Sequence, residues 1–226
     1  METQTEYETL FTRKTYKNRR EWLNARGLTL GASDASAAVG ISPYKTNVEL
    51  WEEKTGPIEP EDIGDKPCVR FGNDAEPLIR EMFALENIDN CTVFYRQHEV
   101  LTSIKYPWMS ASLDGELIRI DDQARGVLEI KTSTIKSATM AKEWNGGIPK
   151  IYLVQVLHQL VVTGYPFAIL RAHIIDRYEN RVSYDNEYQF KASDYADEMQ
   201  WLIQKEFDFW ECVKAGKRPA TILPEI

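Results

Sequence analysis

Two runs of alternating apolar and polar residues, separated by a polar break, stand out where the chain reads MSASLDGELIRIDDQARGVLEIKTS, positions 109–133. Alternation with a period of two predicts β-strands, and the break at Asp121 and Asp122 predicts the turn of a hairpin. A turn at this point pairs residues whose numbers add up to about 243, which sets Asp114 opposite Glu129. A longer turn through Arg125 shifts the register by a residue or two, and the sequence leaves that choice open.

The remaining pattern predicts helices and strands in sequence around this hairpin. Helices are expected at residues 16–25, 33–40, 47–56, 73–86, 149–163 and 192–214, and strands at 91–104, 167–176 and 181–190. Asn73 or Asp74 is expected to cap the helix that runs to Glu86, whereas Thr46 and Glu49 predict a capping box at the start of another helix. The order of elements indicates an α/β fold with a mixed sheet, a central hairpin and flanking helices.

A chain of 226 residues without a Pro/Ser/Gly-rich linker is expected to form a single domain. Residues 1–15 are expected to be a flexible arm, 16–56 N-terminal helices and 70–214 the core. The acidic, proline-bearing stretch at 57–67 is expected to be a mobile connection between them.

The composition points to a cytoplasmic protein. Three scattered cysteines lack the spacing of a zinc site or of a disulfide framework. The N-terminus shows no signal-peptide pattern, and no apolar run is long enough to span a bilayer, so no membrane association is expected.

The formal net charge of −8 argues against a nucleic-acid partner, but the charges are unevenly distributed. Residues 13–26 contain six basic residues and one acid, residues 131–150 contain four lysines and one acid, and residues 176–211 contain ten acids and four basic residues. This asymmetry fits a local basic surface with an acidic outer face, and it also fits an ordinary solvated surface.

The predicted hairpin carries the candidate chemistry. Glu129 and Lys131 are two residues apart, so their side chains share one face of the strand while Leu128 and Ile130 point into the core. Charges inside a strand are costly unless they are paired or bind a metal. Two carboxylates here, Asp114 and Glu129, suit a hard divalent cation, and the alternative is a buried ion pair with the lysine.

The predicted helices supply further candidates. Ser33 is expected to be an N-cap, and the free amides of that helix start, with Arg26 seven residues upstream, could hold a phosphate; the alternative is that Ser33 only caps. Glu76 lies in the first turn expected for its helix, where the helix dipole stabilises a negative charge. Gln155 shares a polar stripe with Tyr152 and Gln159 on an otherwise apolar helix, and this stripe either faces a site or is satisfied by neighbouring backbone.

Four sequence blocks, in this order, resemble the YqaJ-like viral recombinase family, to which phage lambda exonuclease belongs, within the PD-(D/E)xK nuclease superfamily. The blocks are GASDASAAVGISPYKTNVELWEEKTG, FGNDAEPLIREMF, MSASLDGEL and LEIKTS, and the resemblance covers roughly residues 26–164. It implies a restriction-endonuclease-like core. In one departure, Leu113 stands where the family often has proline before the aspartate.

The resemblance also implies a role for each matching residue. Asp114, Glu129 and the backbone carbonyl of Ile130 would bind Mg²⁺, for which Mn²⁺ can substitute, and Lys131 would be the catalytic lysine. Glu76 would assist in binding the metal or the water, and Gln155 would support Lys131 or the water. Arg26 and Ser33 would bind the 5′-phosphate.

The implied activity is Mg²⁺-dependent 5′–3′ digestion of double-stranded DNA ends, which leaves 3′ single strands for phage-type homologous recombination in a bacterial host or prophage. The implied partners are a single-strand annealing protein and further copies of the chain, with a trimeric ring favoured. Two alternatives stay open: another PD-(D/E)xK nuclease such as a RecB-like enzyme, and a non-catalytic DNA-end-binding partner of the annealing protein.

Overall fold

The computed structural model describes residues 9–56, 66–179 and 182–222 of the chain. Its helices are α2 (Arg19–Gly27), α3 (Ala35–Ala38), α4 (Asn47–Thr55), α5 (Pro67–Glu86), α6 (Ala138–Trp144), α7 (Lys150–Thr163) and α8 (Ala196–Lys214), and 3-10 turns at Ala32–Asp34 and Ala192–Tyr195 precede α3 and α8. The predicted capping box is confirmed, because Thr46 and Glu49 bond reciprocally at the start of α4. The stretch expected to be a mobile connection lies mostly outside the described residues.

The strands form two sheets, not the single sheet expected from the sequence. A five-stranded mixed sheet has the order β3 (Cys91–Phe94), β6 (Gly115–Arg119), β7 (Arg125–Ile135), β8 (Phe167–Asp176), β9 (Ser183–Lys191). A four-stranded sheet has the order β1 (Phe11–Thr15), β4 (Glu99–Ser103), β5 (Met109–Ala111), β2 (Leu30–Gly31). The larger sheet is antiparallel except for the β7–β8 pair, which α7 connects as a parallel crossover.

The predicted hairpin is confirmed, and its register is that of the shorter of the two turns considered. Strands β6 and β7 pair antiparallel with Gly115 opposite Leu128 and Ile118 opposite Arg125. The same register places Asp114, just before β6, across from Glu129. Because β7 is longer than β6, its edge on that side has no partner strand in the described chain from Glu129 onward.

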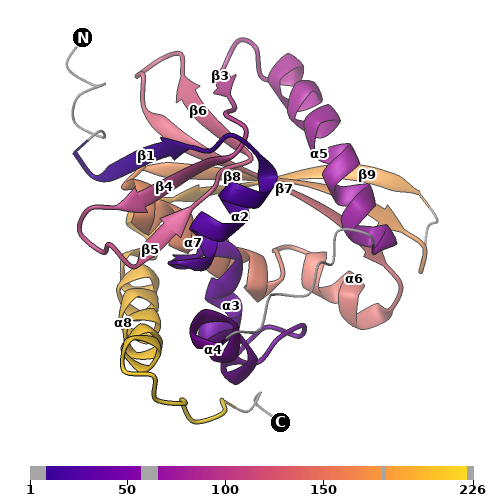
Figure 1. Cartoon of the computed structure of the whole chain (residues 1–226). Coiled ribbons are helices and arrows are strands. Elements are labelled where there is room, and N and C mark those ends of the chain that lie inside the picture. Colours follow the sequence, from indigo (N-terminus) through magenta and orange to yellow (C-terminus); the bar gives the residue numbers. More distant parts are fainter. Residues whose placement is uncertain (1–8, 57–65, 180–181, 223–226) are drawn as a thin grey trace.

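Helices cover both faces of the larger sheet (Figure 1). On one face, Ile79 and Phe83 of α5 pack against Leu117, Leu128 and Ile130. Val127 on β7 belongs instead to the core on the α7 side. This alternation is the period-two pattern read from the sequence, and it turns Glu129 and Lys131 toward α7.

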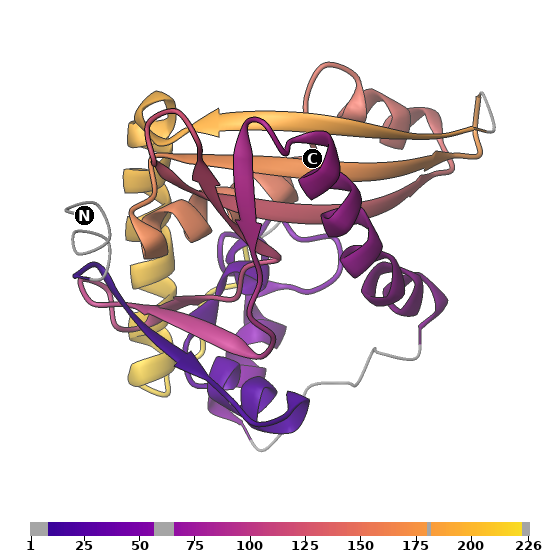
Figure 2. The ribbon, with the colours of Figure 1, turned by 90° about the horizontal axis from the view of Figure 1, so that it is seen from above.

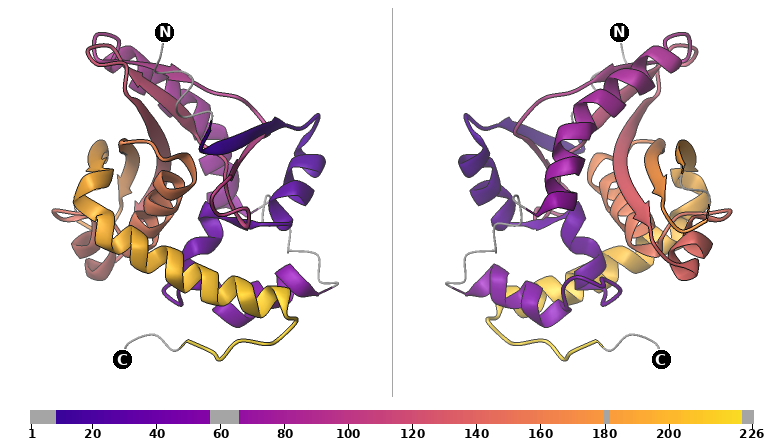
Figure 3. Two further views of the ribbon diagram at one scale, coloured as in Figure 1. Left: turned by 90° about the vertical axis from the view of Figure 1, so that its left-hand side faces the viewer. Right: turned by 90° about the vertical axis from the view of Figure 1, so that its right-hand side faces the viewer.

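Figure 2 shows the long strands β7, β8 and β9 side by side, with α8 near one of their ends. The two further views in Figure 3 show α8 beside the N-terminal helices and α5 running obliquely over the opposite part of the molecule. A small apolar cluster joins these N-terminal helices to α8 through Leu50, Ala38 and Phe209. The N-terminal segment is therefore packed into the fold together with the core.

The prediction of a flexible arm at residues 1–15 is wrong for its last part, because Phe11–Thr15 forms strand β1. This strand pairs antiparallel with β4, a partner nearly ninety residues away. The side chain of Arg13 also binds Glu99 and the buried Glu116, with closest distances of 2.5 and 2.7 Å. Pairing with a distant strand orders residues 11–15, and the local pattern of the sequence does not reveal such pairing.

The single strand expected at 91–104 is also wrong. It is divided into β3 and β4, which belong to different sheets. The chain leaves β3 after Phe94 and reaches β4 through His98, whose φ of +58° lies in the left-handed region. This break lets one stretch of chain connect the two sheets.

Helix α5 begins earlier than expected, at Pro67, so neither Asn73 nor Asp74 caps it. Its buried face is narrow, because Ile79 and Phe83 are buried whereas Leu78 and Met82 are 63% and 51% exposed. Helices α7 and α8 follow the predicted ranges closely, and Gly164 ends α7 in the left-handed conformation. None of the described helices combines the length and apolar character needed to cross a membrane.

Candidate active site

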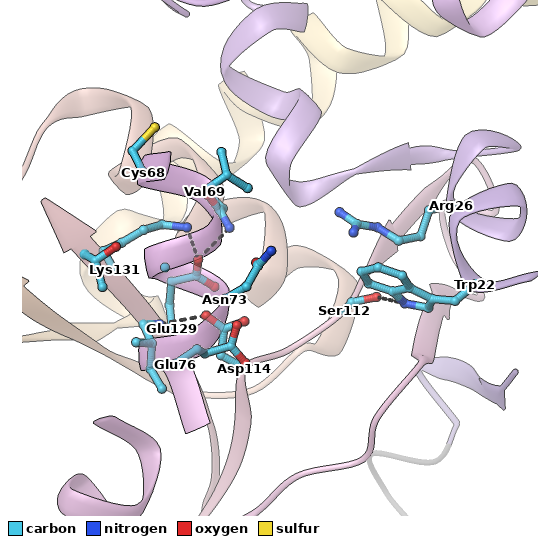
Figure 4. A pocket seen from close by; sticks show the side chains of 14 residues that line it. Trp22, Arg26, Cys68, Val69, Asn73, Glu76, Ser112, Asp114, Glu129 and Lys131 are labelled. Atoms are coloured by element: carbon cyan, nitrogen blue, oxygen red, sulfur yellow. Dashed lines mark hydrogen bonds and ion pairs between the residues drawn. The ribbon is translucent and has the colours of Figure 1, made fainter. Parts of the chain in front are cut away.

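A polar cavity of about 350 Å³ lies at the open edge of β7, between α5 on one side and α2 on the other (Figure 4). Its lining includes seven of the eight residues singled out in the sequence, namely Arg26, Glu76, Asp114, Glu129, Ile130, Lys131 and Gln155. The eighth, Ser33, reaches the cavity indirectly because it bonds to Arg26. Segments far apart in the sequence therefore converge on one site.

Asp114 occupies the point where β6 begins and the ladder with β7 ends. Its Oδ2 accepts a hydrogen bond of 2.8 Å from the backbone amide of Ile130, which has no partner on a neighbouring strand at this edge. Its Oδ1 receives no hydrogen bond from any described residue. Burial, together with the charges of Glu129 and Glu76, raises the pKa of Asp114 well above the usual value for an aspartate.

Glu129 is the most buried of the three carboxylates that line the cavity, those of Glu76, Asp114 and Glu129, and it is 1% exposed. Gln155 donates to its Oε1 and Gln159 donates to its Oε2, each at 2.6 Å. In the structure the Gln155 amide holds the glutamate, and its expected support of the lysine or of a water stays a prediction. Two donors on one helix, the half-buried Gln155 and the buried Gln159, fix the orientation of this carboxylate.

Lys131 lies on the same face of β7, as the spacing predicted, with Nζ 2.5 Å from Glu129 Oε1. The ion-pair alternative considered for the strand is thus present. Burial acts to lower the pKa of Lys131, but Glu129 and Asp114 outweigh it and raise the pKa to about 12. The ammonium group also lies 5.3 Å from the ring centroid of Tyr152, a cation–π contact.

Glu76 faces the same cavity, but from the middle of α5 and not from a first turn. The interpretation that a helix N-terminus stabilises its charge is therefore wrong. Arg80 donates to Glu76 Oε1 at 3.0 Å, and the guanidinium group stacks on Tyr95 with 3.5 Å to the ring centroid. Burial nevertheless raises the pKa of Glu76 and outweighs the opposing effect of Arg80.

Arg26 lies across the cavity from the carboxylates, and Figure 4 shows its guanidinium group directed toward them. It donates to Ser33 Oγ at 3.0 Å and lies 4.4 Å from the ring centroid of Trp22. No carboxylate of the described chain forms an ion pair with it, and burial lowers its pKa. A cation held without a full counter-charge is suited to an anionic ligand.

Ser33 is not the N-cap that the sequence suggested. It lies inside the 3-10 turn that Gly31 begins, where Asp34 Oδ2 accepts from the Gly31 amide at 3.1 Å. Lys54 neutralises Asp34 at 2.8 Å. The serine hydroxyl thus serves to position Arg26, and the expected arginine–serine pair exists without the expected helix cap.

The carboxylate and carbonyl oxygens of the cavity are candidate ligands for a divalent metal. Among the residues that the structure describes, no group of three or more His, Cys, Asp or Glu side chains is close enough together to hold one ion. Asp114 and Glu129, with Ile130 at the cavity wall, still offer the hard oxygen donors that Mg²⁺ prefers. The crowding of negative charge that raises the pKa of Asp114 is what a cation would relieve.

Several residues in the cavity or directly behind it were not anticipated. Asn73 contributes from α5, and Ser112 Oγ accepts a hydrogen bond of 3.0 Å from the indole Nε1 of Trp22. Gln159, fully buried, was visible in the sequence as part of the polar stripe on α7, but nothing assigned it to Glu129. Helical spacing showed that it shared a face with Gln155; the partner became apparent only when β7 was placed against α7.

The mixed sheet, with helices on both faces and an Asp…Glu-x-Lys set at the point where its hairpin ladder ends, defines a fold of the PD-(D/E)xK type. The chain belongs to the YqaJ-like viral recombinase family, whose domain model matches residues 21–166.

The chain is similar to a curated protein, the uncharacterized protein YqaJ of Bacillus subtilis (strain 168), with 30% identity over 211 residues. This match covers 90% of the chain and 59% of that protein, so the chain spans about three fifths of its relative's length.

Similar solved structures include an alkaline exonuclease, LHK-Exo, from Laribacter hongkongensis. Its TM-score is 0.60 at 18% identity, with 87% of this chain and 93% of that chain covered. The structure of LHK-Exo in complex with dAMP gives a TM-score of 0.61 at 17% identity and the same coverage. At these identities the likeness establishes the shared fold.

Proposed function

We propose that the protein is a Mg²⁺-dependent exonuclease that degrades double-stranded DNA from 5′ ends and leaves 3′ single strands for phage-type recombination. The observation that carries the proposal is the cavity in which Asp114, Glu129 and Lys131 face Arg26 across a space open to solvent. Family membership supports recombination as the context, and the solved neighbour of the same fold is described as an exonuclease.

Asp114, Glu129 and the carbonyl of Ile130 would hold the metal, and Glu76 would complete the acidic side of the site. When bound, Mg²⁺ supplies activation of water and neutralisation of charge on the phosphate. The protein's own contribution is orientation. Gln155 and Gln159 fix the Glu129 carboxylate through one partly buried and one fully buried hydrogen bond.

Lys131 provides a positive charge where a phosphodiester would gain negative charge during hydrolysis. Its position on β7 is set by the strand, and the cation–π contact with Tyr152 limits the motion of its long side chain. A preorganised charge of this kind stabilises a transition state without reorganisation at the moment of reaction.

Arg26 would bind a terminal 5′-phosphate. The guanidinium group is held from the side by Ser33 and from one face by Trp22, so that it remains directed into the cavity. Recognition of a terminal phosphate beside the reacting bond would select ends over internal positions. The acidic stretch at 176–211 would keep the remaining surface from binding DNA non-specifically.

The proposed partners rest on the family resemblance alone. They are a single-strand annealing protein and further copies of the chain in a ring, with a trimer favoured. Size-exclusion chromatography with light scattering tests the ring directly, and a monomer at micromolar concentration would argue against it.

The activity is tested with linear duplex DNA labelled at the 5′ or the 3′ end, during a titration of Mg²⁺ or Mn²⁺. We expect metal-dependent release of mononucleotides from the 5′ label first, and no digestion of closed circular DNA. Lys131→Ala is expected to abolish digestion and to keep most of the DNA affinity. Undiminished digestion by this variant would remove the basis of the proposal, and binding without cutting by the wild type would favour the non-catalytic alternative.

The end-selecting site is tested by comparing 5′-phosphorylated with 5′-hydroxyl duplexes. The wild type is expected to prefer the phosphorylated end, and Arg26→Ala is expected to lose that preference because it removes the charged donor. Ser33→Ala should weaken the preference by a smaller factor, since it leaves the guanidinium group in place. Equal rates for both ends in the wild type would refute this part of the proposal.

A further inference from the structure

A buried lysine supports the segment that carries Arg26 and Ser33. Lys54 lies in the last turn of α4, and its side chain is only 7% exposed. Its Nζ donates to the carbonyl of Thr29 at 2.7 Å and lies 3.5 Å from the carbonyl of Arg26. The same Nζ lies 2.8 Å from Asp34 Oδ2. Lys54 does not line the catalytic cavity, so all of its contacts are with residues 26–34 and none is with a ligand held there.

The helix that carries Lys54 is firmly packed. Leu50 is fully buried in the apolar cluster that includes Phe209 of α8, and Trp51 Nε1 donates to the carbonyl of Cys212 at 3.1 Å. A cation is also stabilised where the carbonyls at the end of a helix lack intrahelical partners, as at the end of α2. The position of the ammonium group is therefore set by the fold.

Asp34 is an acid that acts on Arg26 without pairing with it. Burial lowers the pKa of Arg26, and of the acids that oppose this effect Asp34 acts most strongly. The two side chains nevertheless form no ion pair in the described chain. Asp34 Oδ2 is instead bound by Lys54 and by the amide of Gly31, and Arg26 donates to the hydroxyl of Ser33.

Without Lys54, Asp34 would compete with a phosphate for the same cation. Burial acts to raise the pKa of Asp34, but Lys54 outweighs it and the pKa is lowered, so the group is a carboxylate at neutral pH. A buried carboxylate that loses its counter-charge is costly, which favours pairing with another cation within reach. The fork of an arginine binds a carboxylate and a phosphate in the same bidentate manner. Arg26 cannot serve both.

We propose that Lys54 is a positioning residue of the phosphate site: it binds Asp34 and thereby leaves Arg26 available for a terminal phosphate. This inference rests on the proposed function, because it concerns the same end-selecting site. It adds that the preference for a phosphorylated end depends on a buried charge that does not touch the DNA.

The test uses the full chain and a hairpin duplex with one blunt end, whose 5′ terminus is either phosphorylated or a hydroxyl. The preference for phosphate is measured twice, as a ratio of kcat/KM values with Mg²⁺ and as a ratio of affinities in EDTA. Lys54→Met is expected to lower both ratios about tenfold, the size of a lost charge-assisted hydrogen bond. Its kcat/KM on the 5′-hydroxyl end should stay near the wild-type value. Lys45→Met is the matched control, because Lys45 pairs with Glu53 of α4, and it should change neither ratio.

A second substitution separates competition from mere loss of structure. The double variant Lys54→Met, Asp34→Asn is expected to recover most of the preference, because it removes the acid that competes for Arg26. The asparagine oxygen can still accept from the amide of Gly31. Asp34→Asn alone should keep at least the wild-type preference, and it remains informative if Lys54→Met does not fold.

The inference is overturned if Lys54→Met keeps the wild-type ratio or loses activity equally on both ends. It is also overturned if the double variant shows no more preference than Lys54→Met, or if Asp34→Asn alone loses the preference.

Failure of the proposed function is a separate result. A wild type that digests neither DNA, but binds the phosphorylated end preferentially in EDTA with the same dependence on Lys54 and Asp34, would reject the nuclease and keep the inference. A wild type that digests and binds both ends equally would keep the nuclease and reject the phosphate site together with this inference.

Discussion

His158 and Glu206 form a fully buried pair that joins α7 to α8, and breaking it is expected to destabilise the protein strongly. Both side chains are 0% exposed, and Nδ1 lies 2.9 and 3.0 Å from the two carboxylate oxygens. Nε2 lies 3.0 Å from the carbonyl of Ser110, which can only accept a hydrogen bond. The imidazole therefore donates from both nitrogens and carries a positive charge.

The size of the effect follows from this burial. His158→Leu would leave the Glu206 carboxylate buried without a counter-charge. Removal of one partner of a buried ion pair costs about 3–5 kcal/mol. For a chain of this size, that loss corresponds to a fall in Tm of roughly 6–20 °C.

The pair also predicts a pH dependence of stability. Burial acts to lower the pKa of His158, but Glu206 outweighs it, and the pKa is raised above the usual histidine value. A raised pKa in the folded state means that the stabilisation is complete below the unfolded-state pKa of about 6.5. It is lost as the pH rises through the folded-state pKa, with a slope of at most about 1.4 kcal/mol per pH unit.

Urea unfolding at pH 6 and pH 9 measures both effects, and the difference between wild type and variant cancels the other titrating groups. The double variant His158→Leu, Glu206→Leu is the control, because removing both charges relieves the unpaired carboxylate and should recover most of the loss. The reasoning would be refuted if the free energy of unfolding of His158→Leu lay within about 1 kcal/mol of the wild-type value at pH 6. A loss that small is below the cost expected for breaking a buried ion pair.

Two further perturbations test individual contacts. Gln159→Leu removes one of the two donors to Glu129 and should lower the free energy of unfolding in EDTA by about 1.5–3 kcal/mol; unchanged stability on urea unfolding would show that the 2.6 Å contact contributes little. Thr46→Ala removes the N-cap of α4 and should cost about 1 kcal/mol. In a thermal scan, Thr46→Ser should retain that stability, and equal losses in both variants would argue against the cap.

The sequence was most informative where structure depends on neighbouring residues. The hairpin and the shared face of Glu129 and Lys131 follow from alternation, and both are confirmed, whereas the choice between two registers needed the structure. The bounds of α7 and the capping box of α4 were likewise predicted from spacing and cap residues. The resemblance to the family was carried by the same local motifs, and the family model matches them.

The errors occur where the structure depends on distant partners. Strand β1 forms because it pairs with β4 and because its Arg13 binds the buried Glu116. The chain breaks after β3 because β3 and β4 belong to different sheets. Helix α5 begins at Pro67, which moves Glu76 from a first turn to mid-helix.

The sequence by itself determined the strand that carries Glu129 and Lys131, because side-chain alternation is a property of the backbone. Only the tertiary structure decided which groups surround them. It set Gln155 and Gln159 on the oxygens of Glu129, Asp114 on the amide of Ile130, and Arg26 across the cavity. Burial of apolar surface on both sides of the sheet, which is not specific to any one pair of residues, brings these polar groups together and makes the site.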